Sequence, residues 1–161
     1  MERQAVGMAE LKTAGPGGVL VTLGLGSCVV IAIFEAERRM GSLSHIMLPR
    51  KSSGRRREGE NMNKYADVAI PAAIEALEEM GGKRSSMTAK IAGGACMFDR
   101  AGEGQGAIGR RNVEAVKSIL QSCDLPLVGE DTGGNRGRSV EFMIDSGVLL
   151  VRTIRGEERT I

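Results

Sequence analysis

The chain has 161 residues, of which 42% are hydrophobic and 2% aromatic, and its formal net charge is +2. This length and hydrophobic share predict one domain, spanning residues 1–161, whose core needs no disulfide or metal. The few aromatic rings argue against stacking on single-stranded nucleic acid, and the balanced charge argues against binding to the phosphate backbone of DNA.

Three cysteines, Cys28, Cys96 and Cys123, form no CxxC pair and leave an odd one. This pattern argues against a disulfide framework and against a zinc cluster, and it suits a reducing compartment. The N-terminal segment carries acids and glycines in place of a signal peptide's apolar run, and no other window reaches membrane-spanning length. We therefore expect a soluble cytoplasmic protein without membrane insertion.

The first third of the chain consists of short β-branched runs separated by glycine-rich and polar turns, which is typical of strands. We expect strands over residues 4–12, 19–23, 28–34 and 41–48. The polar segment 35–40 joins the last two into a hairpin. The charged segment 50–63 has no apolar period and predicts a mobile surface loop.

Two later segments have helical periodicity. Residues 65–80 form the first and stop at two glycines, although Pro71 blurs where this helix starts. Asn112 is the expected N-cap of the second, whose apolar face comprises Val113, Val116, Ile119 and Leu120. Further strands are expected over residues 87–92, 125–130, 139–144 and 148–154. Together these elements predict a strand-rich α/β domain with two long helices.

His45 is the single histidine of the chain, so any imidazole catalysis must use it. If Cys28 and His45 lie on the two arms of one hairpin, their midpoint falls at residues 36–37, inside the polar turn. The two side chains would then be nearly opposite each other, where Cβ atoms are about 5 Å apart. A register slip of one residue would turn one of them to the other face of the sheet.

A thiol beside an imidazole indicates nucleophilic catalysis, because a neighbouring imidazolium lowers the pKa of a cysteine from about 8.5 into the acidic range. The glycines that precede Cys28 let the backbone turn sharply and bring its amides close to a substrate carbonyl. We expect the backbone at Gly26 and Ser27, with the N–H groups of Ser27 and Cys28, to form an oxyanion hole.

Other interpretations stay open on the residues alone. Cys28 could be a small buried side chain that opens a core strand, and His45 a core histidine with satisfied hydrogen bonds. Cys96 also follows a glycine pair and competes either as nucleophile or as a turn residue. Cys123 ends a helix and is expected to be structural. The glycine-rich segments 102–106 and 133–138 lack a phosphate-loop signature, and the arginine run within 50–57 is typical of a solvated loop.

Six sequence blocks carry a family resemblance. They are TLGLGSC at 22–28, HIMLP at 45–49, YAD at 65–67, GGACMF at 93–98, IGRRNVEAV at 108–116 and DTGGNRGR at 131–138. In this order, and over nearly the whole chain, the sequence resembles the CheD family of chemoreceptor glutamine deamidases. Two features depart from the family pattern: segment 35–40 lacks an expected Asp, and Cys96 is unusual at its position.

The resemblance implies a triad of Cys28, His45 and Thr22, in which Thr22 hydrogen-bonds the imidazole. It also implies an α/β sandwich similar to the catalytic domain of the cytotoxic necrotizing factor toxins. The implied activity is deamidation of glutamine side chains on methyl-accepting chemotaxis receptors, with no metal or organic cofactor and with a CheC-type phosphatase as partner. The segment 93–98 could belong to the side that faces this partner.

Three alternatives accompany this expectation. Transglutaminase or protease chemistry shares the acyl-enzyme and differs in the acceptor or in the bond that is cleaved. A glutamate methyl ester offers a similar carbonyl, so the same site could hydrolyse it. The chain could also be a regulatory module that binds the CheC-type phosphatase with little turnover.

Overall fold

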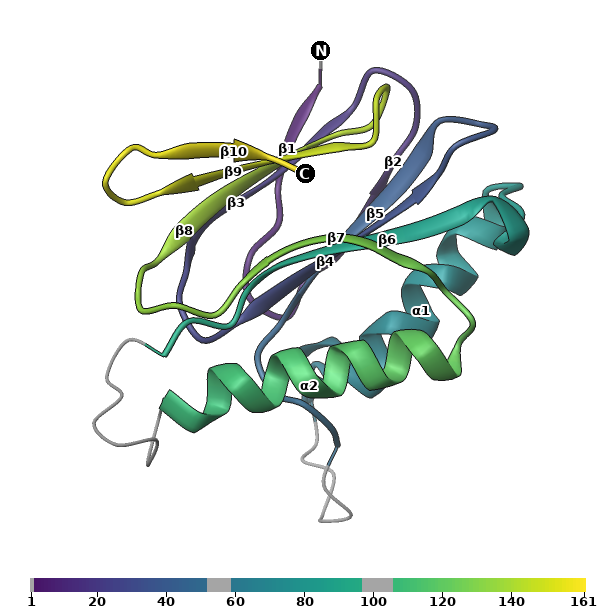
Figure 1. Ribbon diagram of the computed structural model, residues 1–161. Coiled ribbons are helices and arrows are strands. Elements are labelled where there is room, and N and C mark those ends of the chain that lie inside the picture. Colours follow the sequence, from purple (N-terminus) through teal and green to yellow (C-terminus); the bar gives the residue numbers. More distant parts are fainter. Residues whose placement is uncertain (1, 52–58, 97–105) are drawn as a thin grey trace.

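A computed structural model describes residues 2–51, 59–96 and 106–161. The described residues form three layers: an outer sheet, a central sheet and a pair of helices (Figure 1). Both helices lie on the same side of the central sheet, and the outer sheet covers its other side. The expected strand-rich α/β sandwich with mixed sheets and two long helices is therefore confirmed.

The outer sheet is antiparallel except for its first strand, which runs parallel to β3. In spatial order it contains β1 (Arg3–Ala5), β3 (Val19–Leu25), β8 (Arg138–Met143), β9 (Val148–Thr153) and β10 (Glu158–Thr160). The register of β3 on β8 shifts between Thr22 and Leu25, so the end of β3 bulges just before the chain leaves this sheet.

The central sheet is antiparallel except for its last pair, β6 and β7. In spatial order it contains β2 (Leu11–Ala14), β5 (Met40–Ile46), β4 (Val29–Glu35), β6 (Met87–Gly93) and β7 (Leu127–Thr132). The parallel pair is joined by α2 (Gly106–Ser122), as a crossover between parallel strands requires.

The other helix, α1 (Ala66–Glu79), follows a 3₁₀ turn, η1 (Met62–Lys64), and a second 3₁₀ turn, η2 (Arg84–Ser86), leads into β6. Six apolar side chains on one stripe bury α1 against the central sheet: Ala66, Ala69, Ile70, Ala73, Ile74 and Leu77. Pro71 lies within this helix. Neither long helix in the described part of the chain is both long and apolar enough to span a membrane.

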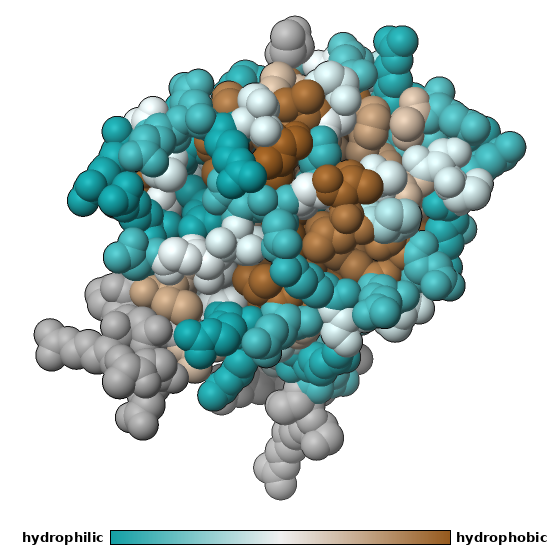
Figure 2. All heavy atoms as spheres, in the orientation of Figure 1, coloured by the Kyte–Doolittle hydropathy of each residue, from teal (hydrophilic) through white to brown (hydrophobic). Residues whose placement is uncertain are grey.

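Two apolar cores follow from the alternation of side chains along β4. Val29, Ile31 and Ile33 face the helices, whereas Val30 and Ala32 face the outer sheet. Since both faces of the strand are covered, it is apolar from Val29 to Phe34, and only Glu35 at its end is charged. Figure 2 shows the surface of this view, where hydrophobic residues gather among hydrophilic ones in the middle of the face.

The structure corrects two sequence-based expectations and adds one strand. The expected strand over 4–12 is two short strands, β1 and β2, which belong to different sheets. Helix α2 begins at Gly106, so Asn112 lies inside the helix and is not its N-cap. The strand β10 was not expected, because its sequence, ERT, has no apolar alternation.

The turn between β4 and β5 is organised by Glu35, whose carboxylate is buried. It accepts the N–H of Glu37 at 2.8 Å and the guanidinium of Arg38 at 3.0 Å. Burial by itself raises the pKa of Glu35, but these hydrogen bonds and one from the Lys83 backbone outweigh it, so the pKa is lowered. The carboxylate therefore sets the turn, which fixes the hairpin register.

We predict that Glu35→Gln lowers the free energy of unfolding by about 1.5–3 kcal/mol at pH 7, the usual worth of hydrogen bonds to a charged group. Because the folded-state pKa is lowered, this contribution is present above the unfolded pKa of the carboxyl and is lost as pH falls through the folded value. Urea unfolding between pH 3 and 7 measures both effects. Glu37→Gln, at an exposed neighbour, is the matched control; equal losses in the two variants would contradict the prediction.

Candidate active site

The chain passes from the outer to the central sheet through the short link of residues 26–28, between β3 and β4. We call this segment the crossing link. It ends at Cys28, which is partly buried and packs against the core between the two sheets. The candidate nucleophile therefore lies at the edge of the inter-sheet space.

All three carbonyl oxygens of the crossing link accept hydrogen bonds. Gly26 O accepts the N–H of Ala95 at 2.9 Å, and Cys28 O accepts the N–H of Gly94 at 2.8 Å. Ser27 O accepts the side-chain amide of Asn112 at 3.0 Å. Within the described residues, no acceptor binds the N–H of Ser27 or of Cys28. These two N–H groups are the donors that were expected to form the oxyanion hole.

His45 lies on β5 and is 4% exposed. Leu43 of the same strand belongs to the core between the sheets, so His45, two residues further, faces that space as well. Its main chain is held by the segment after β1: the N–H of Ala9 donates to His45 O at 2.8 Å, and the N–H of His45 donates to Glu10 O at 3.0 Å.

The register of the hairpin differs from the sequence-based one by two residues. His45 pairs with Val30, not with Cys28, because four residues, 36–39, form the turn and Arg39 adopts a left-handed φ of 49°. An offset of two keeps both side chains on one face, since side-chain direction alternates with period two. Cys28 and His45 are thus diagonal neighbours, a relation in which sites are about 7–8 Å apart and long side chains still reach each other.

No hydrogen bond joins Cys28 to His45 in the described contacts, and Nδ1 of His45 is buried without a partner. Thr22, which is 1% exposed on β3, donates its hydroxyl to the carbonyl of Val6 at 2.8 Å. The Val6 backbone also acts on the His45 ring as a hydrogen-bond acceptor, which raises the pKa of the imidazole. The Thr22 hydroxyl and the protonation of the His45 imidazole therefore both depend on the backbone of Val6.

Burial dominates the protonation of the pair. It raises the pKa of the Cys28 thiol. It lowers the pKa of His45, and the Val6 hydrogen bond and the Glu10 carboxylate offset only part of that effect. Both shifts favour the uncharged thiol and the uncharged imidazole at neutral pH.

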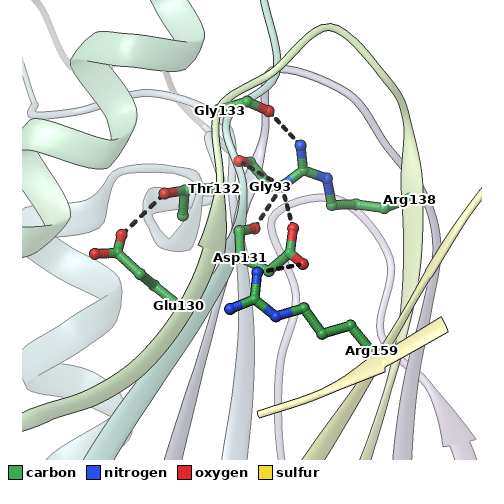
Figure 3. Close-up of polar contacts among 7 residues, drawn as sticks. All are labelled: Gly93, Glu130, Asp131, Thr132, Gly133, Arg138 and Arg159. Atoms are coloured by element: carbon green, nitrogen blue, oxygen red, sulfur yellow. Dashed lines mark hydrogen bonds and ion pairs between the residues drawn. The ribbon is translucent and has the colours of Figure 1, made fainter. Parts of the chain in front are cut away.

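Arg138 joins the two sheets close to the crossing link (Figure 3). It comes from β8 of the outer sheet, is 5% exposed, and forms an ion pair of 2.9 Å with Asp131 of β7. The same guanidinium donates to the carbonyls of Gly93 and Gly133, and Arg159 contacts the other oxygen of Asp131 at 3.7 Å. This cluster fixes the turn after β6. The backbone N–H groups of Gly94 and Ala95 in this turn donate to the crossing link.

Gly93 makes the close approach between β6 and the crossing link possible. Its φ is 112°, and a Cβ at this position would collide with the carbonyl oxygen of Cys28. A larger residue would therefore be strained and would displace the crossing link.

The other sequence-based candidates lie elsewhere. Cys96 follows β6 and donates its N–H to Gly134 O at 2.8 Å, which makes it part of a turn. Cys123 is partly buried against the helix-side core. Residues 52–58 of the arginine-rich loop, Met97 and Phe98, and the glycine-rich segment up to residue 105 lie outside the described residues. No group of three potential metal ligands occurs among residues 2–51, 59–96 and 106–161.

Fold and site together define a two-sheet α/β protein with a cysteine and a histidine on one inter-sheet face. The model of the CheD family of chemotactic sensory transduction proteins matches residues 47–153, and the chain belongs to this family. It is 45% identical over 157 residues to the chemoreceptor glutamine deamidase CheD of Thermotoga maritima, covering 98% of this chain and 96% of that one. It is 41% identical to the protein of the same name from Halalkalibacterium halodurans, covering 97% and 96%.

The raised pKa of the Cys28 thiol predicts the pH dependence of its alkylation. In a Cys96→Ala, Cys123→Ala background, the rate with iodoacetamide should keep rising beyond about pH 8.5, the ordinary thiol value, because burial disfavours the thiolate. A preformed ion pair would instead give a plateau in the acidic range. Mass spectrometry of the alkylated protein from pH 5 to 10 distinguishes a raised thiol pKa from a preformed ion pair. A rate plateau below pH 7 would contradict the prediction.

Gly93→Ala should abolish catalysis and lower the free energy of unfolding by at least about 2 kcal/mol, because positive-φ strain and a backbone collision add. The matched control is Gly133→Ala, which has a φ of 81° but open space around its Cβ. Thermal unfolding and the alkylation rate of Cys28 measure the two effects. Equal damage in both variants would show that strain alone matters.

Proposed function

We propose that the chain hydrolyses the side-chain amide of specific glutamines on methyl-accepting chemotaxis receptors, leaving glutamate, with Cys28 as nucleophile. The observation that carries this proposal is the shared face of Cys28 and His45, beside two backbone N–H groups without an acceptor in the described contacts. The names of the family relatives, chemoreceptor glutamine deamidases, supply the reaction and the class of substrate.

The reaction begins as neutral His45 takes the proton of the Cys28 thiol while the sulfur attacks the glutamine carboxamide carbon. Burial supports this order, because it favours the uncharged form of both groups until the substrate arrives. The carbonyl oxygen becomes an oxyanion, to which the N–H groups of Ser27 and Cys28 donate.

The tetrahedral adduct then collapses. Its C–N bond breaks, the imidazolium of His45 gives its proton to the departing nitrogen, and ammonia leaves a thioester on Cys28. A water molecule, deprotonated by the same imidazole, adds to the thioester carbon. The C–S bond breaks, the proton returns to sulfur, and the product is glutamate with the enzyme thiol restored.

Thr22 acts in this scheme through the carbonyl of Val6. The hydroxyl occupies one lone pair of that oxygen at 2.8 Å, and the ring of His45 interacts with the same backbone group. A carbonyl fixed in this way orients the ring and stabilises the imidazolium that forms in each half-reaction, as the third member does in other triads.

The finer parts of the proposal concern location and partners. The free cysteines of the described chain support a reducing compartment, so we place the reaction in the cytoplasm. A receptor glutamate methyl ester is a second substrate for the same thiol, because methanol leaves more readily than ammonia. A CheC-type phosphatase is the proposed regulatory partner.

The test is mass spectrometry of a receptor cytoplasmic fragment incubated with the protein. The wild type and Cys96→Ala should raise the mass by about one dalton at particular glutamines, and Cys28→Ala and His45→Ala should lose at least about 1000-fold in rate. Modification that survives Cys28→Ala would rule out the proposed nucleophile. Ammonia release without chain cleavage separates deamidation from proteolysis. A wild type that binds the phosphatase without any turnover would favour the regulatory alternative.

The pH profile of this deamidation gives a second readout of the mechanism. Only neutral His45 accepts the thiol proton, so kcat/KM should fall as the pH drops through the pKa of His45, which burial holds below about 6.5. An acid limb well above pH 6.5 would contradict the role assigned to His45.

A further inference from the structure

Asn112 is a buried polar residue that the reaction scheme above does not use. It lies near the middle of α2 and has no exposed surface. Its side-chain nitrogen donates to Ser27 O at 3.0 Å and to Met47 O at 3.1 Å, whereas its oxygen, Oδ1, is buried without a partner. Among the described residues of α2, this is the one fully buried side-chain amide. It donates to two carbonyls that lie close in sequence to Cys28 and His45.

The two acceptors stand next to the two reacting residues in sequence. Ser27 directly precedes Cys28, and Met47 follows His45 by two residues. One planar amide group therefore fixes the separation between the crossing link and the end of β5. Both hydrogens of the amide are used, so its orientation is set by its partners.

The geometry of the peptide bond links the Ser27 carbonyl to the oxyanion site. In a trans peptide the C=O of one residue and the N–H of the next point in opposite directions. Holding Ser27 O toward α2 consequently aims the N–H of Cys28 away from the helix, and this N–H has no acceptor in the described contacts.

Burial of this amide has a cost that packing does not explain. A buried amide with one unsatisfied oxygen loses about 1–3 kcal/mol relative to a solvated one, and a leucine would fill a similar volume without that loss. Neighbouring positions on the same face, Val116, Ile119 and Leu120, are apolar and belong to the helix-side core.

We propose that Asn112 is a positioning residue that orients the Ser27–Cys28 peptide so that the N–H of Cys28 points at the oxyanion. The proposal rests on Cys28 being the nucleophile of the proposed function and deepens it by naming what holds its oxyanion donor. Asn112 does not touch the substrate; it acts through the backbone of the crossing link.

Two reactions of the Cys28 thiol separate this role from general support of the fold. Acylation by p-nitrophenyl acetate passes through a tetrahedral oxyanion, whereas alkylation by iodoacetamide does not form one. Both are measured in the Cys96→Ala, Cys123→Ala background, with Cys28→Ala added as the blank. We expect Asn112→Leu to slow acylation at least about tenfold and to leave alkylation within about threefold.

The matched control is Val116→Ala, which opens a cavity on the same helix face without touching the crossing link. This variant should leave the ratio of the acylation rate to the alkylation rate unchanged, even if it lowers the thermal midpoint as much as Asn112→Leu does. Asn112→Ser, which keeps a short hydroxyl donor, is the second variant and should fall between the wild type and Asn112→Leu; it also provides the result if Asn112→Leu does not fold.

The outcomes divide cleanly. Parallel losses in acylation and alkylation, or no loss in either, would overturn the positioning role. A wild type whose Cys28 is never acylated would overturn it too, because an oriented oxyanion donor should support that reaction. A wild type that is acylated normally but leaves receptor glutamines unchanged would instead reject the proposed function, while the ratio in Asn112→Leu still decides the role of Asn112.

Discussion

The crossing link is the constraint on which the rest of the site depends. A chain that passes between two packed sheets in three residues leaves partly buried carbonyls that need partners, and here every carbonyl of the link is bound from the side of β6 and α2. Satisfying the carbonyls on one side leaves amides facing the other. The same hydrogen bonds that hold the crossing link also leave two backbone N–H groups without an acceptor in the described contacts, next to the Cys28 thiol.

Three distant parts of the sequence cooperate to hold this link. Two backbone N–H groups of the turn after β6 and one side chain of α2 donate hydrogen bonds to the link. Arg138 of the outer sheet holds the same turn by donating to its carbonyls. The ion pair between Arg138 and Asp131 is partly buried, so desolvation offsets much of its contribution to stability, and its main effect is to fix one arrangement of the turn. The site is thus specified by tertiary contacts more than by any single element.

Much of this arrangement could be predicted from the sequence, and the failures have physical reasons. Apolar runs and turn residues predict the long strands and both helices, and the single histidine directs attention to His45. The hairpin register was off by two residues, because a buried carboxylate that caps a four-residue turn leaves no mark on the apolar pattern. An asparagine before an apolar period predicts an N-cap at Asn112, whereas its hydrogen-bond partners lie 65 and 85 residues away in the sequence.

The raised pKa of the Cys28 thiol has a consequence for its reactions with oxidants. Peroxide and disulfides react with thiolates, so a thiol whose pKa is raised by burial is a poor target for both at neutral pH. In the proposed mechanism, the thiol becomes reactive only when a substrate amide is bound and His45 removes its proton. A low thiolate fraction thus limits both oxidation of a cysteine enzyme and its reaction with other proteins when no substrate is bound.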